Sequence, residues 1–245
     1  MPSEFPGFPE AGFRLLKQLK KNNDRDWFRE RKSEYQERVE RPMEELVLAV
    51  AAECRSRQIP LYAKEKNPVM RVYRDVRFSK DKTPFKTHVA AELRRSFRDS
   101  EVMVYLHFSP EQSFVAAGVW QPERTLLHAW RNAIASEPQR FEAVAAELEA
   151  KKIPLSREYS LSAMPRGFQN YSADSFSQWL KLTSFVASRK LEREACTRPG
   201  LVKAAVDFAM AVKPLLQFGW EVENAKPKAA GIRLEQVSRL GRQRA

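Results

Sequence analysis

The sequence predicts an α+β fold, in which an antiparallel β-meander of about four to five strands packs with N-terminal, central and C-terminal helices. Two observations carry this prediction. Apolar residues recur at helical spacing before residue 58 and after residue 122, whereas between 69 and 121 they fall into short β-type runs. The connections between these runs are short and rich in turn residues, which makes antiparallel pairing the economical topology.

The N-terminal region is predicted to form three helices. The pair Asn22-Asn23 ends the first apolar pattern, Asp24 is placed to cap the second helix, and Pro42 fits the first turn of the third. The turn that carries Asn22, Asn23 and Trp27 has two interpretations. It is either a ligand-facing turn or a corner between two helices with an aromatic anchor.

The β region supplies most of the predicted sheet. Its third run alternates apolar side chains with polar or aromatic ones, as a half-buried strand does. A further strand is expected after the central helices. The strands are predicted at residues 69–78, 86–94, 101–108, 113–120 and 182–188.

Helical patterns return in the second half of the chain. Ser136-x-x-Gln139 reads as a capping box with Pro138 in the first turn, and Pro199 opens a long helix that Pro214 should kink or end. No repeat, low-complexity block or Gly-rich linker divides the chain, so residues 1–220 are expected to form one α+β domain. Residues 221–245 are basic and poor in apolar residues, which indicates a mobile C-terminal tail.

Composition narrows the class of protein. The chain carries 43 Lys and Arg against 31 Asp and Glu, a formal net charge of +12. This charge permits association with nucleic acid, an acidic membrane surface or anionic metabolites, and it is equally expected of a protein whose surface is merely basic.

Three features of the sequence predict the cellular compartment. No apolar run reaches the roughly 18 residues of a membrane span, and the N-terminus lacks the basic and apolar regions of a secretory signal. Only two cysteines occur, Cys54 and Cys196, and neither has a second Cys or a His at metal spacing. Buried thiols in a cytoplasmic protein are therefore expected.

The candidate site lies in residues 69–94, where Arg and Lys are interleaved with strand-like sequence. Read as a strand, this stretch directs Arg74 to the same face as apolar side chains such as Val72 and Phe78. A guanidinium in an apolar layer must be paired, so Arg74 is predicted to be buried and bonded to an acid or to main-chain carbonyls. The structural part of the motif comprises Arg74, Asp75, Phe78, Asp81 and Phe85.

The remaining polar residues of this stretch predict an anion site. Asp75 lies two residues from Arg77, on the same side of the strand, and is expected to orient its guanidinium. The donors share one strand face and one connecting loop, an arrangement that suits a phosphate-type ligand. The predicted ligand-binding residues are Arg71, Arg77, Ser79, Lys80, Lys82, Thr83 and Lys86.

Catalytic chemistry is not specified by the sequence. There is no phosphate-binding Gly-rich loop, no nucleophile elbow and no His-Glu-x-x-His motif. If proton transfer occurs, Asp75 and His88 are the candidates. His88 and His107 fall on neighbouring predicted strands, but a metal would need a third ligand, for which Asp75 is nearest in sequence, so no metal site is predicted. Whether the protein uses a cofactor stays unknown from the sequence.

Several motifs carry a resemblance to a known family. Arg71-x-x-Arg74-Asp75-x-Arg77-Phe78 followed by Asp81-Lys82-x-x-Phe85 resembles the signature of domain of unknown function 2461, a conserved hypothetical protein family of bacteria and fungi. That signature often closes on Tyr, where this chain has Phe85. Three further segments resemble the family over nearly the whole chain to about Trp220. They are NNDRDWF at residues 22–28, Gly118-x-Trp120-x-Pro122, and Pro165-Arg166-Gly167-Phe168. The resemblance implies a fold-sized unit and no activity.

Three functions stay open. An enzyme or receptor for a phosphorylated small molecule would have a small concave pocket beside Arg77. A nucleic-acid-associated protein would have a continuous basic stripe with Trp27, Tyr73 or Trp120 exposed for stacking. An interaction protein with an architectural Arg network would pair every motif Arg internally and open no cleft nearby.

Overall fold

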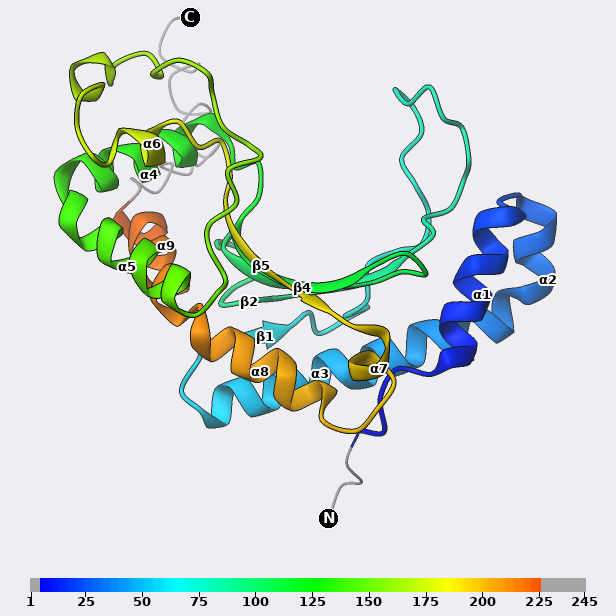
Figure 1. Ribbon diagram of the computed structural model, residues 1–245. Coiled ribbons are helices and arrows are strands. Elements are labelled where there is room, and N and C mark those ends of the chain that lie inside the picture. The colour runs from blue at the N-terminus through cyan, green and yellow to red at the C-terminus, as the bar shows by residue number, and fades with distance from the viewer. Residues whose placement is uncertain (1–4, 226–245) are drawn as a thin grey trace, which may run out of the picture.

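Alternating apolar side chains build a five-stranded antiparallel sheet, whose strand order in space equals the order along the chain. The computed structural model describes residues 5–225 (Figure 1). The α+β fold predicted from the sequence is confirmed. The strands are β1 (Tyr62–Ala63), β2 (Val89–Arg94), β3 (Met103–Phe108), β4 (Ser113–Val119) and β5 (Phe185–Leu191).

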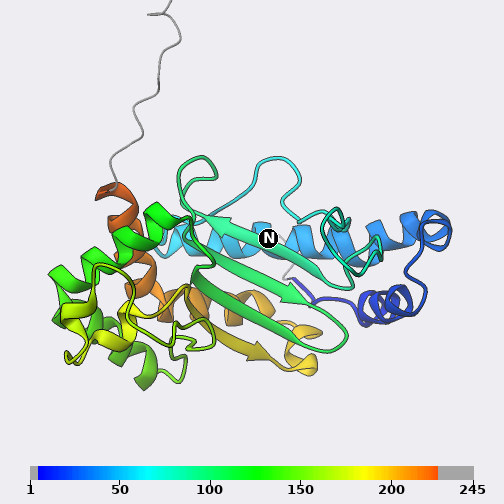
Figure 2. The same ribbon diagram turned by 90° about the horizontal axis from the view of Figure 1, so that it is seen from above.

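The two faces of the sheet differ because successive side chains point to opposite sides. On β3, Leu106 and Phe108 are fully buried, whereas Tyr105 and His107 are half-buried on the other side. Within residues 5–225, helices such as α3 (Arg41–Ser56) and α8 (Leu201–Ala211) lie against the buried face, and no helix lies above the central strands on the opposite face (Figures 1 and 2). The fold thus leaves one face of a packed sheet available for contacts.

Helices from both ends of the chain cover the buried face. Asp24 caps α2 by accepting from the amide of Trp27 at 2.8 Å, and Pro42 lies in the first turn of α3, as predicted. The N-terminal helices are α1 (Glu10–Lys21), α2 (Arg25–Tyr35), a π-helical segment (Gln36–Glu40) and α3 (Arg41–Ser56). The C-terminal helices are α7 (Arg193–Cys196), α8 (Leu201–Ala211) and α9 (Lys213–Ala225).

The central helices form a lobe at one end of the sheet, seen at the left of Figure 1. We define the lobe as residues 124–184. The predicted capping box is wrong, because Ser136 is the last residue of the preceding helix and caps nothing, although Pro138 begins the next helix as expected. The lobe contains α4 (Arg124–Ser136), α5 (Pro138–Ala150), a 3₁₀ turn (Gln169–Tyr171) and α6 (Ser177–Leu180).

The predicted strand at residues 69–78 is not a strand of the sheet. Residues 70–88 leave the sheet and return as an extended two-limbed projection, which we call the arm (upper right in Figure 1). Its limbs are joined by the bonds from Arg74 N to Pro84 O and from Lys86 N to Val72 O, both near 2.9 Å. The burial alternates along the segment, but beyond the sheet its main-chain bridge within the described residues is to its own return limb, Tyr73 with Phe85. Phe78 is therefore 95% exposed and not in the core.

Helix α9 continues past residue 220, where the C-terminal tail was predicted to begin. Pro214 does separate two helices, since it lies in the first turn of α9. That helix continues to Ala225, and Glu223 accepts from the amides of Glu101 and Val102 at 2.6 and 2.8 Å. Residues 221–225 thus belong to the packed fold, and the rest of the predicted tail lies outside the described residues. The single domain over residues 1–220 stays a prediction.

Cys54 and Cys196 are both buried, as the sequence predicts, and neither forms a disulfide. Burial raises the pKa of each thiol to about 11, so both remain protonated near neutral pH. Within residues 5–225, no helix has both the length and the apolar character required to cross a bilayer.

Candidate functional site

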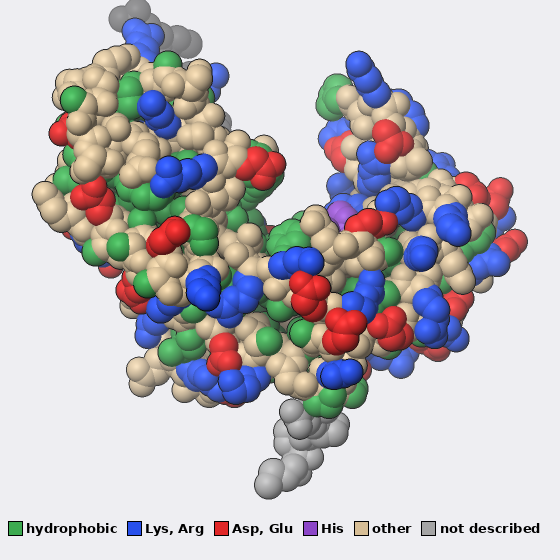
Figure 3. Space-filling view, in the orientation of Figure 1, with side chains coloured by type: hydrophobic (Ala, Val, Ile, Leu, Met, Phe, Trp, Pro, Cys, Tyr) green, Lys and Arg blue, Asp and Glu red, His purple; other side chains and the backbone are tan. Residues whose placement is uncertain are grey.

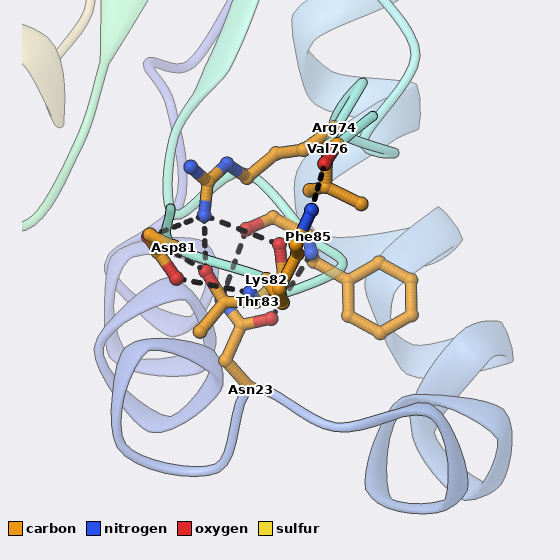
Figure 4. Close-up of polar contacts among 7 residues, drawn as sticks. All are labelled: Asn23, Arg74, Val76, Asp81, Lys82, Thr83 and Phe85. Atoms are coloured by element: carbon orange, nitrogen blue, oxygen red, sulfur yellow. Dashed lines mark hydrogen bonds and ion pairs between the residues drawn. The ribbon is translucent and has the colours of Figure 1, made fainter. Parts of the chain in front are cut away.

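Arg74 braces the arm from within. Its guanidinium bonds to the Asp81 carboxylate at 2.5 Å, to the carbonyl of Thr83 at 3.1 Å and to the hydroxyl of Thr83 (Figure 4). The predicted pairing with an acid and a carbonyl is therefore present. The predicted burial is not, since 27% of the Arg74 side chain is exposed. The face that carries Val72, Arg74 and Val76 is half-buried and is not part of the core, because the arm lies outside the sheet.

Asp81 has its own local reason for this position. It accepts from the amide of Thr83 at 2.9 Å, the turn that an Asp side chain makes with the residue two positions on. This bond and the contact with Arg74 hold the pKa of Asp81 at about 2, so it is a carboxylate at all ordinary pH values. The charge that Arg74 needs is thus built into the turn.

Asn23 fastens the arm to the corner between α1 and α2. Its amide donates to the carbonyl of Phe85 at 2.9 Å and accepts from the amide of the same residue at 3.0 Å (Figure 4). The ring of Phe85 stacks on Phe28 with centroids 4.2 Å apart. Of the two interpretations of this turn, the contacts of Asn23 fit the corner, because its hydrogen-bonding groups are occupied by the arm.

Three of the predicted ligand donors, Arg77, Lys82 and Thr83, are also engaged inside the arm. Asp75 accepts from Arg77 through two nitrogens, at 3.0 and 2.7 Å, so it orients that guanidinium as expected. Hydrogen bonds from Arg77 hold the pKa of Asp75 below its usual range. The ammonium of Lys82 donates to the carbonyl of Val76 at 2.9 Å. Thr83 is bonded to Arg74 and Asp81, as described above.

Arg71 and Lys86 both lie at the base of the arm and line one hollow, apart from the other predicted donors. Burial lowers the pKa of Lys86, and the positive charge of Arg71 lowers it further, so the two cations lie within each other's field. No ion pair involves either side chain among the described residues. Both line a hollow of about 680 Å³, whose other charged side chains are Lys32, Lys64, Glu40 and Glu92.

Ser79 and Lys80 lie at the far end of the arm, beside Phe78. Lys80 is exposed and Ser79 is half-buried. The seven predicted donors are therefore not gathered at one point. Arg71 and Lys86 lie at the base, Lys82 and Thr83 brace the middle, and Arg77, Ser79 and Lys80 lie at the tip.

A larger groove, with a volume of about 810 Å³, lies over the open face of the sheet. The space-filling view shows it as the hollow between the arm and the lobe (Figure 3). Met70 and Glu92 line both this groove and the hollow at the arm base, so the two are adjacent. Its floor and walls include Tyr105, His107, Phe114, Trp120, Tyr159 and Lys190.

Gly118 explains how Trp120 reaches the groove wall. At Gly118 the backbone has φ +122°, and a Cβ there would lie 1.9 Å from the carbonyl oxygen of Phe185, so only glycine fits. The chain then turns out of β4, and Trp120 packs edge-on against Tyr159 with centroids 4.3 Å apart. Trp120 keeps 43% of its surface exposed.

The histidines of the open face are neutral near pH 7. His88 and His107 approach as the sequence suggested, with ring centroids 4.4 Å apart. Burial lowers the pKa of His107 to about 4, helped by His88, and burial with the nearby Lys86 lowers the pKa of His88. Burial also raises the pKa of Tyr105 to about 12. Neutral imidazoles beside a phenol offer proton acceptors and donors without charge.

The third ligand that a metal would need is absent from this histidine pair. Among residues 5–225, no group of three His, Cys, Asp or Glu side chains could hold a metal ion. Asp75, the nearest candidate in sequence, is bonded to Arg77 on the arm. Of the two proton-transfer candidates, only His88 stands beside the sheet face, and that role stays a prediction for both.

Sequence reasoning missed much of the groove lining. Glu92, Tyr105, Ser188 and Lys190 all occupy the non-core positions of strands, where polar or aromatic residues alternate with apolar ones. That alternation is the signal that could have identified them. It becomes informative only when the strand register is known, because the register brings positions far apart in sequence onto one face.

Of the four segments that resemble the family, two build the arm, one shapes the groove and one lies in the lobe. Asn22–Phe28 and the Arg-rich signature build and fasten the arm, whereas the Gly118 segment directs Trp120 to the groove. The fourth, Pro165–Phe168, forms a turn in the lobe, closed by the bond from Phe168 N to Pro165 O at 3.1 Å, with Arg166 exposed.

Comparison with known proteins agrees with these motifs. A family model described as conserved hypothetical protein (DUF2461) matches residues 11–218, which is most of the chain and includes every motif discussed above. Neither the curated proteins nor the solved structures yield a match. The chain therefore belongs to the DUF2461 family of conserved hypothetical proteins.

Proposed function

We propose that this protein binds a phosphate-bearing ligand at the junction of the two hollows, with Arg71 and Lys86 on the phosphate. The observation that carries the proposal is the pairing of these two cations. Lys86 is half-buried and Arg71 is exposed, and two like charges close to each other are unfavourable unless an anion joins them. Neither has an ion-pair partner among residues 5–225, in contrast to Arg74 and Arg77 on the same arm.

The rest of the ligand would lie on the open face of the sheet. The groove that begins at Met70 and Glu92 is lined by aromatic side chains, including Tyr105, Trp120 and Tyr159. Aromatic faces favour flat ring systems, and stacking of this kind tolerates different bases. A phosphate at the arm base with a flat ring in the groove describes a nucleotide or a chain of nucleotides.

An architectural Arg network accounts for only part of this arrangement. It explains Arg74 and Arg77, which are paired with Asp81 and Asp75. It does not explain why Arg71 and Lys86 stand together beside an open groove. At the arm base we therefore place neither Arg77 nor Lys82 on the phosphate, since Lys82 braces the arm and Arg77 lies at its tip.

Calorimetry against nucleotides, nucleosides and sugar phosphates at two salt concentrations tests the proposal. Nucleotides should bind, nucleosides should bind much more weakly, and added salt should reduce affinity. Arg71→Ala and Lys86→Ala should each weaken nucleotide binding about tenfold or more, since a hydrogen bond to a charged group contributes roughly 1.5–3 kcal/mol. Lys203→Ala serves as the control, because it removes a lysine from α8, against the opposite face of the sheet.

Two results would contradict the proposal. One is equal binding of nucleosides and nucleotides, which would remove any role for the phosphate. The other is unchanged nucleotide affinity in the Arg71→Ala, Lys86→Ala double variant.

A further inference from the structure

The tip of the arm carries an unusually exposed aromatic side chain. Phe78 is 95% exposed, whereas Tyr73, the next most exposed large apolar residue, has 51% of its surface in contact with solvent. A phenylalanine gains most from burial when it is completely covered. Its position at the end of a projection leaves nothing else in the described chain to cover it.

The arm presents this ring on a braced support. Arg74 ties Asp81 to Thr83, and Lys82 donates to the carbonyls of Val76 and Arg77 at 2.9 and 3.4 Å. These bonds cross the arm just below the tip. Phe78 therefore stays at a defined distance from the sheet, which reduces the ordering cost when a ligand covers it.

The charge around Phe78 indicates what covers it. Arg77 lies next to it in the chain, with its guanidinium carbon 5.8 Å from the ring centroid, and the exposed Lys80 follows two residues later. The acids of the arm, Asp75 and Asp81, are neutralised by Arg77 and Arg74. In Figure 3, Lys and Arg side chains lie beside exposed apolar side chains at the tip of the arm. A ligand with negative charge and flat apolar faces fits this surface.

We propose that Phe78 stacks on a base of single-stranded nucleic acid, with Arg77 and Lys80 on the flanking phosphates. This inference rests on the proposed function and deepens it, because it selects a polymer over a free nucleotide. The groove provides a second set of aromatic faces at Trp120 and Tyr159. A single strand of nucleic acid that stacks on Phe78 and on the groove aromatics must extend from the tip of the arm to the floor of the groove. Bases of a single strand expose the faces that such stacking requires.

Fluorescence anisotropy with labelled oligothymidylates of about 5 and about 20 nucleotides tests this inference. Phe78→Ala should weaken binding of the longer strand about tenfold, since stacking on one base changes affinity roughly fivefold to a hundredfold. Phe78→Trp should restore it, because tryptophan keeps a stacking face. Met210→Ala, which truncates an exposed apolar residue on α8, should have no effect.

Nucleotide binding, measured in parallel, separates this inference from the proposed function. If Phe78→Ala binds the longer strand as tightly as wild type while nucleotides still bind, the tip assignment is wrong and the site at Arg71 and Lys86 stands. If wild type binds neither nucleotides nor strands, both fail. Equal affinity for duplex and single strand overturns the choice of single strands. Phe78-dependent binding to anionic phospholipid vesicles, without an effect on strands, assigns the tip to a membrane surface and overturns the inference.

Discussion

The Asn23 side chain joins two distant parts of the chain through two hydrogen bonds. Its amide imitates a neighbouring strand, since it offers one donor and one acceptor to the main chain of Phe85. The two partners are 62 positions apart in sequence, so the contact joins the α1–α2 corner to the arm. No other side-chain amide within residues 5–225 makes this double contact with the arm.

Replacement of Asn23 by alanine is expected to lower the free energy of unfolding by about 2 kcal/mol. The change leaves the donor and acceptor of Phe85 unpaired in a partly buried place, which costs roughly 1–3 kcal/mol. Urea denaturation measures the change. Asn22→Ala is the matched control, because the Asn22 amide bonds only to Gln18 within its own helix end. Equal losses for the two variants would contradict the role assigned to Asn23.

His107 should make stability depend on pH. Its pKa in the folded protein is about 4, below the ordinary value near 6.5, so between these values the unfolded chain binds a proton that the folded protein does not. Stability is therefore complete above about pH 6.5 and falls as the pH is lowered toward 4. A loss of about 2 kcal/mol is expected, once partial exposure is allowed for.

Urea denaturation of wild type and His107→Gln across pH 7 to about 4 measures this contribution. The variant should lose less stability than wild type over that interval, because glutamine does not titrate. Carboxylates that titrate in the same range affect both proteins equally. Parallel curves for the two proteins would show that His107 is free to take up a proton in the folded state.

At the scale of elements, the arm is a local structure whose braces are polar and partly exposed. Its polar contacts involve Arg74, Asp81, Thr83 and Lys82, and its apolar anchor is Phe85. Exposed ion pairs contribute little to global stability. The braces therefore decide the order of the arm more than they decide whether the protein folds.

Arg74→Ala and Asp81→Asn are expected to loosen the arm without unfolding the sheet. Amide hydrogen exchange should accelerate in residues 74–84 and remain slow in β3, while the denaturation midpoint changes little. Lowering the pH should act in the same direction. Because the pKa of Asp81 is depressed to about 2, its contribution is complete above its ordinary value and is lost as the pH falls toward 2. Uniform acceleration over the whole protein would contradict a local role.

The arm also marks the limit of what sequence predicts at this scale. Alternation along residues 69–78 correctly predicted an extended chain, and the spacing of Asp75 and Arg77 correctly predicted their bond. Alternation does not reveal whether a strand has neighbours on both sides. Arg74 was therefore expected in the core, and Phe78 with it, although both lie on a projection outside the sheet.

At the scale of the molecule, the groove is an assembly of distant parts. Glu92 comes from β2, Tyr105 from β3, Lys190 from β5 and Tyr159 from the lobe. The class of fold and the existence of most elements followed from periodicity and turn residues. The groove did not, because it depends on the register of four strands and on where the lobe lies against them.

Glu223 links the last described helix to the start of β3. Its carboxylate accepts from the hydroxyl of Ser100 at 2.8 Å and from the amides of Glu101 and Val102. Glu223→Ala is expected to lower the free energy of unfolding by about 2–3 kcal/mol, since it leaves these partly buried donors without an acceptor. Chemical denaturation measures the effect, with Glu221→Ala as the control because Glu221 pairs with Arg140 on the surface. If Glu223→Ala lowers the free energy of unfolding no more than Glu221→Ala does, Glu223 does not stabilise the fold as proposed.

The strand order of the sheet has a kinetic consequence. Residues 109–112 connect β3 to β4, whereas residues 120–184 separate β4 from β5. The number of residues in the longer connection is about four doublings of that in the shorter one. This difference adds about 2 kcal/mol to the free-energy cost of closing the loop. The β2–β4 hairpins should therefore form first during refolding, and β5 should dock last, together with the lobe. Until β5 arrives, the edge of β4 is exposed, and the refolding chain is at its most vulnerable to aggregation.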